Sequence, residues 1–242
     1  MILIGHRGAR KEAPENTPAG FLHLRQLGIN HVELDVRLSK DGQLVVLHDT
    51  TVNRTTQHKG NVLEFTAAEL AAMDASQPLP HWPTATGIPT LDSVLAAWPE
   101  LKSIQLEVKT ASNDILVKIG HGLVELIQRY RLQHKAIITS ADQNMLSTMQ
   151  RLAPRIRRGF VAERFTRDPI EVCLNHHCSH LVINYHRCTP EMIGNAHAVG
   201  LEVSTWTVNE VNAARRLQNW GVDSIITDVP STLLKHLHVE VE

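Results

Sequence analysis

Two acidic residues, Glu33 and Asp35, lie two positions apart in the stretch VELDVRLSKDGQLVVLHD, residues 32–49. The apolar residues that alternate with them predict a β-strand, so both carboxylates share one face of that strand. Asp41-Gly42 favours a two-residue hairpin turn, and that register places His48 opposite Asp35. Adjacent carboxylates repel each other unless a cation lies between them. We therefore expect a cation site on this face rather than a solvated polar face.

A third carboxylate ends another predicted strand. The run SIQLEVK carries Glu107 and Lys109 on the face opposite to its apolar residues. Collected at one rim with Glu33 and Asp35, Glu107 completes a set of three oxygen ligands. Such a set suits a hard divalent cation, Mg²⁺ or Ca²⁺, and does not suit a structural zinc.

Basic and titratable residues accompany these carboxylates. The first predicted strand ends in His6-Arg7-Gly8. Arg7 and Lys109 carry the fixed positive charge that an anion such as phosphate requires. His6 and His48 titrate near neutrality and can supply an acid and a base. Together these groups predict a centre that cleaves phosphoesters.

The elements that position these residues alternate along the chain. Helical periodicity separates eight short β-rich runs, which predicts a parallel sheet with crossover helices. Eight such units in 242 residues favour a (β/α)8 TIM barrel. A doubly wound open sheet would need a glycine-rich first turn, and GHRGAR does not match GxGxxG. The predicted strands are 2–5, 31–36, 103–108, 136–139, 159–162, 181–184, 201–205 and 224–227.

One region interrupts this alternation. Residues 50–89 follow the hairpin and predict a small insertion after the second strand, placed over the catalytic face. The sequence FTAAEL predicts a short helix over 66–73, with Thr66 as N-cap and Glu69 in a capping box. Neither a linker nor a repeat divides the chain, so we expect residues 1–242 to form a single domain.

Composition narrows the classes of protein and partner. The formal net charge of −1 provides no basic field for nucleic acid, and no segment approaches the ~20 apolar residues of a membrane span. The three cysteines and the opening MILIGHRG, which does not resemble a secretion signal, lead us to expect a cytoplasmic protein. CLNHHCSH at 173–180 lacks the second ligand pair of a zinc site. Exposed helices would allow a homodimer, but no apolar seam predicts one.

A set of short motifs resembles the glycerophosphodiester phosphodiesterase family, and in particular its soluble bacterial cytoplasmic members. The motifs occur in the family's order and span nearly the whole chain. They are HRG at 6–8, ENT at 15–17, the hairpin at 32–49, RTT at 54–56, GIPTL at 87–91, LEVK at 106–109, TWTVN at 205–209 and ITDVP at 226–230.

This resemblance implies a fold and an activity. The fold is a (β/α)8 barrel, and the activity is hydrolysis of glycerophosphodiesters, such as glycerophosphocholine and glycerophosphoethanolamine, to sn-glycerol 3-phosphate and an alcohol. It implies one divalent cation, Mg²⁺ or Ca²⁺, a small-molecule substrate, and no nucleic-acid or membrane partner. The implied roles are metal binding by Glu33, Asp35 and Glu107, acid–base catalysis by His6 and His48, and substrate binding by Arg7, Lys109, Trp206, Glu15 and Asn16.

Several alternatives stay open at this point. Glu15 orients His6 or joins the shell of the metal, Asp228 caps the final helix, and Glu202 joins the site or pairs with a lysine. Which histidine acts as acid is undecided. A related barrel phosphodiesterase of the phosphoinositide-cleaving or sphingomyelinase D kind, and a catalytically inactive glycerophosphodiester-binding barrel, are the rival functions.

Overall fold

Strand β1 (Ile2–His6) lies between β2 (His31–Leu38) and β9 (Ser224–Thr227), and it pairs with both in parallel. This double pairing closes an eight-stranded parallel barrel, in the order β1, β2, β4, β5, β6, β7, β8, β9. The computed structural model describes residues 1–79, 81–162 and 168–237. The remaining barrel strands are β4 (Ser103–Val108), β5 (Ala136–Ser140), β6 (Arg157–Ala162), β7 (His180–Asn184) and β8 (Glu202–Trp206).

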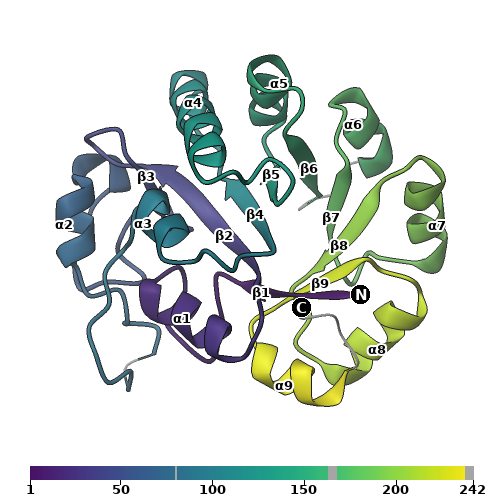
Figure 1. Cartoon of the computed structure of the whole chain (residues 1–242), viewed down its shortest axis with the longest axis horizontal. Coiled ribbons are helices and arrows are strands. Elements are labelled where there is room, and N and C mark those ends of the chain that lie inside the picture. The colour runs from purple at the N-terminus through teal and green to yellow at the C-terminus, as the bar shows by residue number, and fades with distance from the viewer. Residues whose placement is uncertain (80, 163–167, 238–242) are drawn as a thin grey trace.

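Helices follow the strands and surround the barrel (Figure 1). Threonine or aspartate N-caps begin most of them, with a side-chain oxygen accepting a bond from the first turn, as in Thr17 and Asp142. The helices are α1 (Pro18–Gln26), α2 (Ala67–Ala72), α3 (Leu91–Ala96), α4 (Asn113–Arg129), α5 (Gln143–Leu152), α6 (Pro169–Asn175), α7 (Pro190–Ala198), α8 (Val211–Asn219) and α9 (Pro230–His236). The predicted (β/α)8 barrel is therefore confirmed. None of the helices in the described ranges is long and apolar enough to span a membrane.

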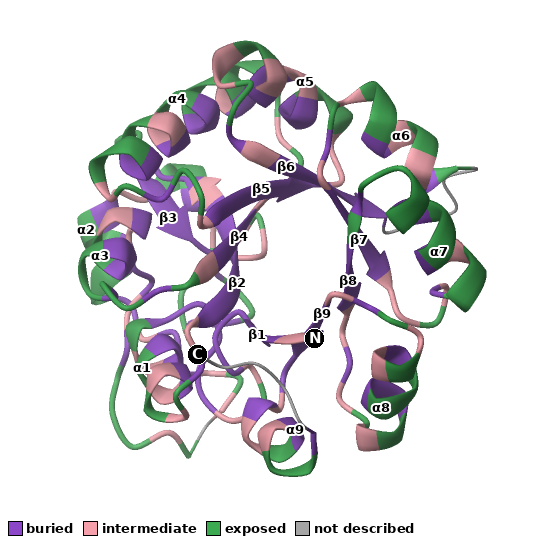
Figure 2. Cartoon of the chain, turned by 45° about the vertical axis from the view of Figure 1, so that its right-hand side comes forward, coloured by how far each residue is buried: buried purple, intermediate pink, exposed green. Residues whose placement is uncertain are grey.

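Apolar side chains pack mainly between the strands and the helices. Figure 2 shows the strands almost wholly buried, whereas the helices are buried on one side and exposed on the other. Leu34 and Leu106 on neighbouring strands are fully buried in the large cluster on this outer face of the sheet. A separate cluster of Ile4, Val161, Val182 and Ile226 is smaller. The opposite face of β2 and β4 is thereby left for the polar residues of the site.

The hairpin forms, but the register predicted for it is wrong by one residue. Strand β3 (Leu44–Val46) pairs antiparallel to β2 with Leu38 opposite Leu44, and Leu47 N donates to Asp35 O. Ser39 N donates to Gln43 O across a three-residue loop, in which Gly42 has a φ of 78°. Such loops place glycine in the left-handed region after a tight turn. His48 therefore does not lie opposite Asp35 in the sheet.

The residues after β3 form the insertion that the sequence predicts after the second strand. It contains a short 3-10 helix, η1 (Val62–Glu64), and α2, whose Thr66–Glu69 capping box is confirmed. Because of the shifted register, Val45 and Leu47 turn away from the main core and pack with insertion residues such as Leu70. The hairpin thus anchors the insertion beside the open rim of the barrel.

Candidate active site

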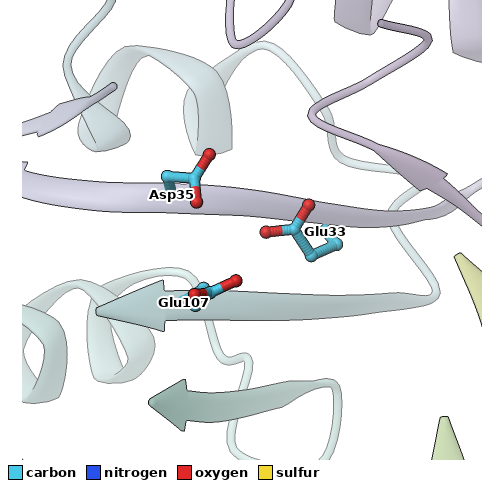
Figure 3. A group of neighbouring side chains, drawn as sticks. All are labelled: Glu33, Asp35 and Glu107. Carbon is cyan, nitrogen blue, oxygen red and sulfur yellow. The ribbon is translucent and has the colours of Figure 1, made fainter. Parts of the chain in front are cut away.

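Three carboxylates lie together on neighbouring strands. Asp35 on β2 pairs in register with Glu107 on β4, and Glu33 lies two residues before Asp35 on the same face. The three side chains converge (Figure 3), and each offers an oxygen within 4.8 Å of the others. This grouping is the one that the sequence predicts from strand parity.

The chemistry of this group fits a hard divalent cation. Burial, together with the charges of Asp35 and Glu107, raises the pKa of Glu33 well above its usual value. Glu33 Oε1 is buried and has no hydrogen-bond partner within the described ranges. A bound cation would satisfy this oxygen and relieve the repulsion, and all the ligand atoms are oxygens.

Two basic side chains lie against Asp35. Arg7 Nε is 3.1 Å from Asp35 Oδ2, and Lys109 Nζ is 2.9 Å from Asp35 Oδ1 while also donating to Glu107. Burial alone would raise the pKa of Asp35, but Lys109 and Arg7 hold it well below its usual value. Asn16 Nδ2 donates to Asp35 Oδ2 at 2.8 Å. Asp35 is therefore ionised at neutral pH and held in one orientation.

His6 is oriented by a carboxylate from the far end of the chain. Asp228 Oδ1 accepts from His6 Nδ1 at 2.6 Å, and Asp228 Oδ2 accepts from Asn209 Nδ2 at 2.9 Å. The proton on Nδ1 leaves Nε2 to exchange a proton with a substrate. His6 Nε2 lies 3.8 Å from Glu33 Oε2. Burial lowers the pKa of His6, and the bond to Asp228 opposes that shift only in part.

His48 is also oriented by an aspartate, and here the aspartate is the next residue in the sequence. Its Nδ1 donates to Asp49 Oδ1 at 2.6 Å, which again leaves Nε2 free to exchange a proton. Arg54 Nε in turn donates to Asp49 Oδ2 at 2.6 Å. Burial lowers the pKa of His48, and the charge of Asp35 opposes that shift. The site therefore contains two imidazoles, each fixed through Nδ1 by an aspartate.

Glu15 accepts hydrogen bonds from arginine side chains and, among the described residues, does not contact a histidine. Its two oxygens accept from Arg7, Arg10 and Arg54 at 2.8–3.2 Å. Burial would raise the pKa of Glu15, but the charges and hydrogen bonds of Arg54 and Arg7 lower it to about 2. The suggestion that Glu15 orients His6 is therefore wrong in this geometry. Arg7 and Asn16 have φ values of 51° and 55°, a backbone region that costs energy for residues with a side chain.

These groups enclose a cavity of about 120 Å³ at the open end of the barrel. His6 and His48 both line it, and so do Arg7, Lys109, Glu33 and Glu107. Trp206 also lines the cavity, in the position that the sequence predicts, and its buried Nε1 has no partner within the described ranges. A cavity of this size with convergent charges can hold a phosphate and a small group attached to it.

Three acidic residues have roles that the sequence analysis assigned differently, left open or did not mention. Asp228 does not cap α9, whose N-cap Val229 has no side-chain bond, and it holds His6 instead. Glu202 lies outside the site, more than half exposed, with its carboxylate 3.1 Å from His180. Asp49 follows His48 directly in the sequence, and that adjacency was an available signal for its role.

Among the described residues, the candidate group of metal ligands contains no residue of the segment CLNHHCSH. Cys173 and Cys178 are buried, and His176 contacts Ser147 and Gln143 near the surface. His176 is the C-cap of helix α6.

Comparisons with known proteins agree with this geometry. Residues 6–232 match the glycerophosphoryl diester phosphodiesterase family. A glycerophosphodiester phosphodiesterase of Caldanaerobacter subterraneus is 33% identical, over 96% of both chains. The structure of an Oleispira antarctica phosphodiesterase in complex with the product sn-glycerol-3-phosphate superposes with a TM-score of 0.87, with 27% identity over 98% of this chain and 96% of that one. A glycerophosphodiester phosphodiesterase from Agrobacterium tumefaciens has a TM-score of 0.84, with 27% identity over 97% and 99% of the two chains. The resemblance seen in the sequence motifs is confirmed, and the chain belongs to the glycerophosphoryl diester phosphodiesterase family.

Proposed function

We propose that this protein hydrolyses glycerophosphodiesters, such as glycerophosphocholine and glycerophosphoethanolamine, to sn-glycerol 3-phosphate and an alcohol. One observation carries the proposal: two aspartate-held histidines face a single cavity beside a carboxylate cluster and two fixed cations. Acid–base cleavage of a phosphodiester can use all of these groups, the histidines for proton transfer and the cations for charge stabilisation. The presence of both histidines and all three carboxylates argues against a barrel that only binds its ligand.

The residues act on the substrate in distinct ways. Arg7 and Lys109 bind the phosphate oxygens and offset the negative charge that grows on them. One histidine takes a proton from the nucleophile, which is water or the glycerol 2-hydroxyl, and the other gives a proton to the leaving alkoxide. Attack by the 2-hydroxyl gives a cyclic phosphate, which water then opens to sn-glycerol 3-phosphate with the roles of the two histidines reversed. Asp228 and Asp49 keep the two imidazoles in the tautomer that exposes Nε2.

Glu33, Asp35 and Glu107 would hold one divalent cation, Mg²⁺ or Ca²⁺. When bound, that ion supplies charge stabilisation for the phosphoryl oxygens. Glu15 and Asn16 support the substrate-binding side indirectly, since Glu15 fixes Arg7 and Asn16 fixes Asp35. Trp206 lines the space beside the phosphate.

The remaining parts of the proposal concern the molecule as a whole. We propose one domain over residues 1–242, a cytoplasmic location supported by three buried free cysteines, and no nucleic-acid or membrane partner. A homodimer is compatible with the exposed helices, and sedimentation of the purified protein tests it.

Product analysis tests the proposed activity. Glycerophosphocholine is incubated with the protein, with Mg²⁺ or Ca²⁺ or with a chelator, and sn-glycerol 3-phosphate is measured. We expect product only when a divalent cation is present, and a strong loss of activity in His48→Ala. His197→Ala is the matched control, because His197 also pairs with an aspartate, Asp223, but on the surface. Absence of product with metal present, or full activity in His48→Ala, would refute the assignment.

A further inference from the structure

Three cavities follow one another along the rim of the barrel beside His48. The catalytic cavity of about 120 Å³ adjoins an open passage of about 550 Å³, and that passage adjoins a third cavity of about 160 Å³. His48, Glu107 and Lys109 line both of the first two. Arg37, Thr50, Lys109 and Thr110 line both of the last two. A molecule held at the histidines can therefore extend into the third cavity.

The third cavity is apolar. It lies between the end of β2, the helix η1 and the first turns of α4. Its apolar lining consists of Val36, Leu38, Val62, Leu63, Ala111, Ile115 and Ile119. Leu63 is 38% exposed although it is a large apolar side chain. Apolar surface that faces water in a concave site favours an apolar ligand, because filling the site removes that surface from water.

Another part of the lining of the catalytic cavity is apolar. Val161, Val182 and Ile226, which pack together in one cluster, line it there with Trp206. A volume of about 120 Å³ accommodates the phosphate and little more than the glycerol. The passage shares His48, Glu107 and Lys109 with the catalytic cavity, so it offers the second substituent of the phosphate a path out of the site.

The charges along the passage do not favour a cationic substituent. Arg37 and Lys109 both line it, and Arg37 is fixed by donating from Nε and Nη2 to His48 O at 2.8 and 2.7 Å. The acidic groups there are already paired: Asp49 accepts from His48 and Arg54, and Glu107 accepts from Lys109. An ammonium group in this passage would meet two fixed positive charges and carboxylates that already have partners.

We propose that the apolar cavity binds the end of the leaving alcohol, so that the enzyme prefers glycerophosphodiesters of alkyl or aryl alcohols over those of small cationic alcohols. This inference rests on the proposed function and adds a substrate class to it. Leu63 and Ile115 act as specificity residues in this assignment, and they take no part in the chemical step.

A homologous series of substrates tests the proposal. Glycerophosphodiesters of straight-chain alcohols from ethanol to octanol are compared by kcat/KM. We expect kcat/KM to rise by up to about fourfold per methylene and then to level off when the cavity is full. Ala111 lines the cavity, and Ala111→Leu fills part of it, so this variant should flatten the rise while leaving the ethyl substrate unchanged. Ala97→Leu is the matched control, since Ala97 lines an apolar groove between α1 and α3, remote from the catalytic residues.

Each outcome bears on one claim. Release of sn-glycerol 3-phosphate from any glycerophosphodiester tested, glycerophosphocholine included, decides whether the proposed function holds. A flat alkyl series in the unmodified enzyme, or a rise that Ala111→Leu leaves unchanged, overturns the leaving-alcohol assignment. A second substrate carries a hexanoyl ester on its glycerol and ethanolamine as its alcohol. If that ester raises kcat/KM and the alkyl alcohols do not, the cavity binds the glycerol side, and the proposal is wrong.

Discussion

Replacing Asp228 by asparagine changes one atom and should disable His6. Asp228 Oδ1 accepts from His6 and Oδ2 accepts from Asn209 Nδ2, whereas an asparagine offers only one acceptor oxygen. Asn209 cannot turn its amide to compensate, because its Oδ1 already accepts from Asp228 N and from Thr227 Oγ1. Either His6 or Asn209 must therefore face an N–H group. The variant loses one charge-assisted bond that the folded protein cannot replace.

The size of the effect follows from the bond that is lost. A hydrogen bond to a charged group contributes about 1.5–3 kcal/mol. If that energy is expressed in the transition state, kcat falls by roughly 10- to 150-fold, at 1.36 kcal/mol per factor of ten. Because Asp228 touches His6 and no phosphate-binding residue, KM should change less than kcat.

Steady-state kinetics and thermal unfolding of Asp228→Asn provide the measurement. The control is Asp223→Asn, in which the asparagine replaces the partner of His197 on the surface and should leave kcat unchanged. A kcat within twofold of the unmodified enzyme, in a variant that is folded, would show that Asp228 does not position His6. A change in KM alone, with kcat unchanged, would contradict the reasoning as well.

Three other predictions concern the metal group, the arginine cluster and the backbone. In the unmodified protein, free Mg²⁺ or Ca²⁺ at 100 times its Kd should stabilise the fold by about 2.7 kcal/mol and raise the Tm. Glu33→Gln should abolish this rise in Tm. A rise retained in the variant would exclude Glu33 as a ligand. The pKa of Glu15 is lowered by its arginine partners to about 2, so its stabilisation is present above the usual pKa and is lost as pH falls towards 2. Between pH 7 and pH 3 this loss amounts to roughly 2 kcal/mol, and urea unfolding of Glu15→Gln should lack it; equal pH dependence in both proteins would contradict the pairing. In Gly87→Ala the new methyl would lie 2.0 Å from a carbonyl oxygen of α2, which should lower the free energy of unfolding by roughly 1–3 kcal/mol. In Gly194→Ala the new methyl meets nothing within 4 Å in α7, and the variant should raise the free energy of unfolding by up to about 1 kcal/mol. A similar Tm for the two variants would refute this contrast.

Much of the barrel and of its polar rim can be predicted from local pattern. Strand parity alone places Glu33, Asp35 and Glu107 on one face, because the side-chain period of a strand is two whatever the partner strand is. The alternation of strand and helix then brings the ends of neighbouring strands to the same rim. These inferences need no knowledge of long-range contacts, which explains why they agree with the structure.

The inferences that failed depend on information beyond the local pattern. Asp41-Gly42 is compatible with a loop of two or of three residues, and the side chain of Ser39, which bonds Asp41 and the backbone of Gln43, selects the longer one. Asp228 stands before a good helix start, so its local context favours a cap. Its actual partner, His6, is 222 residues away and cannot be found from spacing.

The pairing of the first strand with the last has a consequence for how the protein is made. His6 leaves the ribosome 222 residues before its aspartate partner, which follows β9. A chain interrupted before that point has the metal-binding carboxylates and both histidines but lacks the group that orients one of them. Turnover should therefore begin only after Asp228 has left the ribosome and reached His6, so its onset during synthesis would report when the barrel closes.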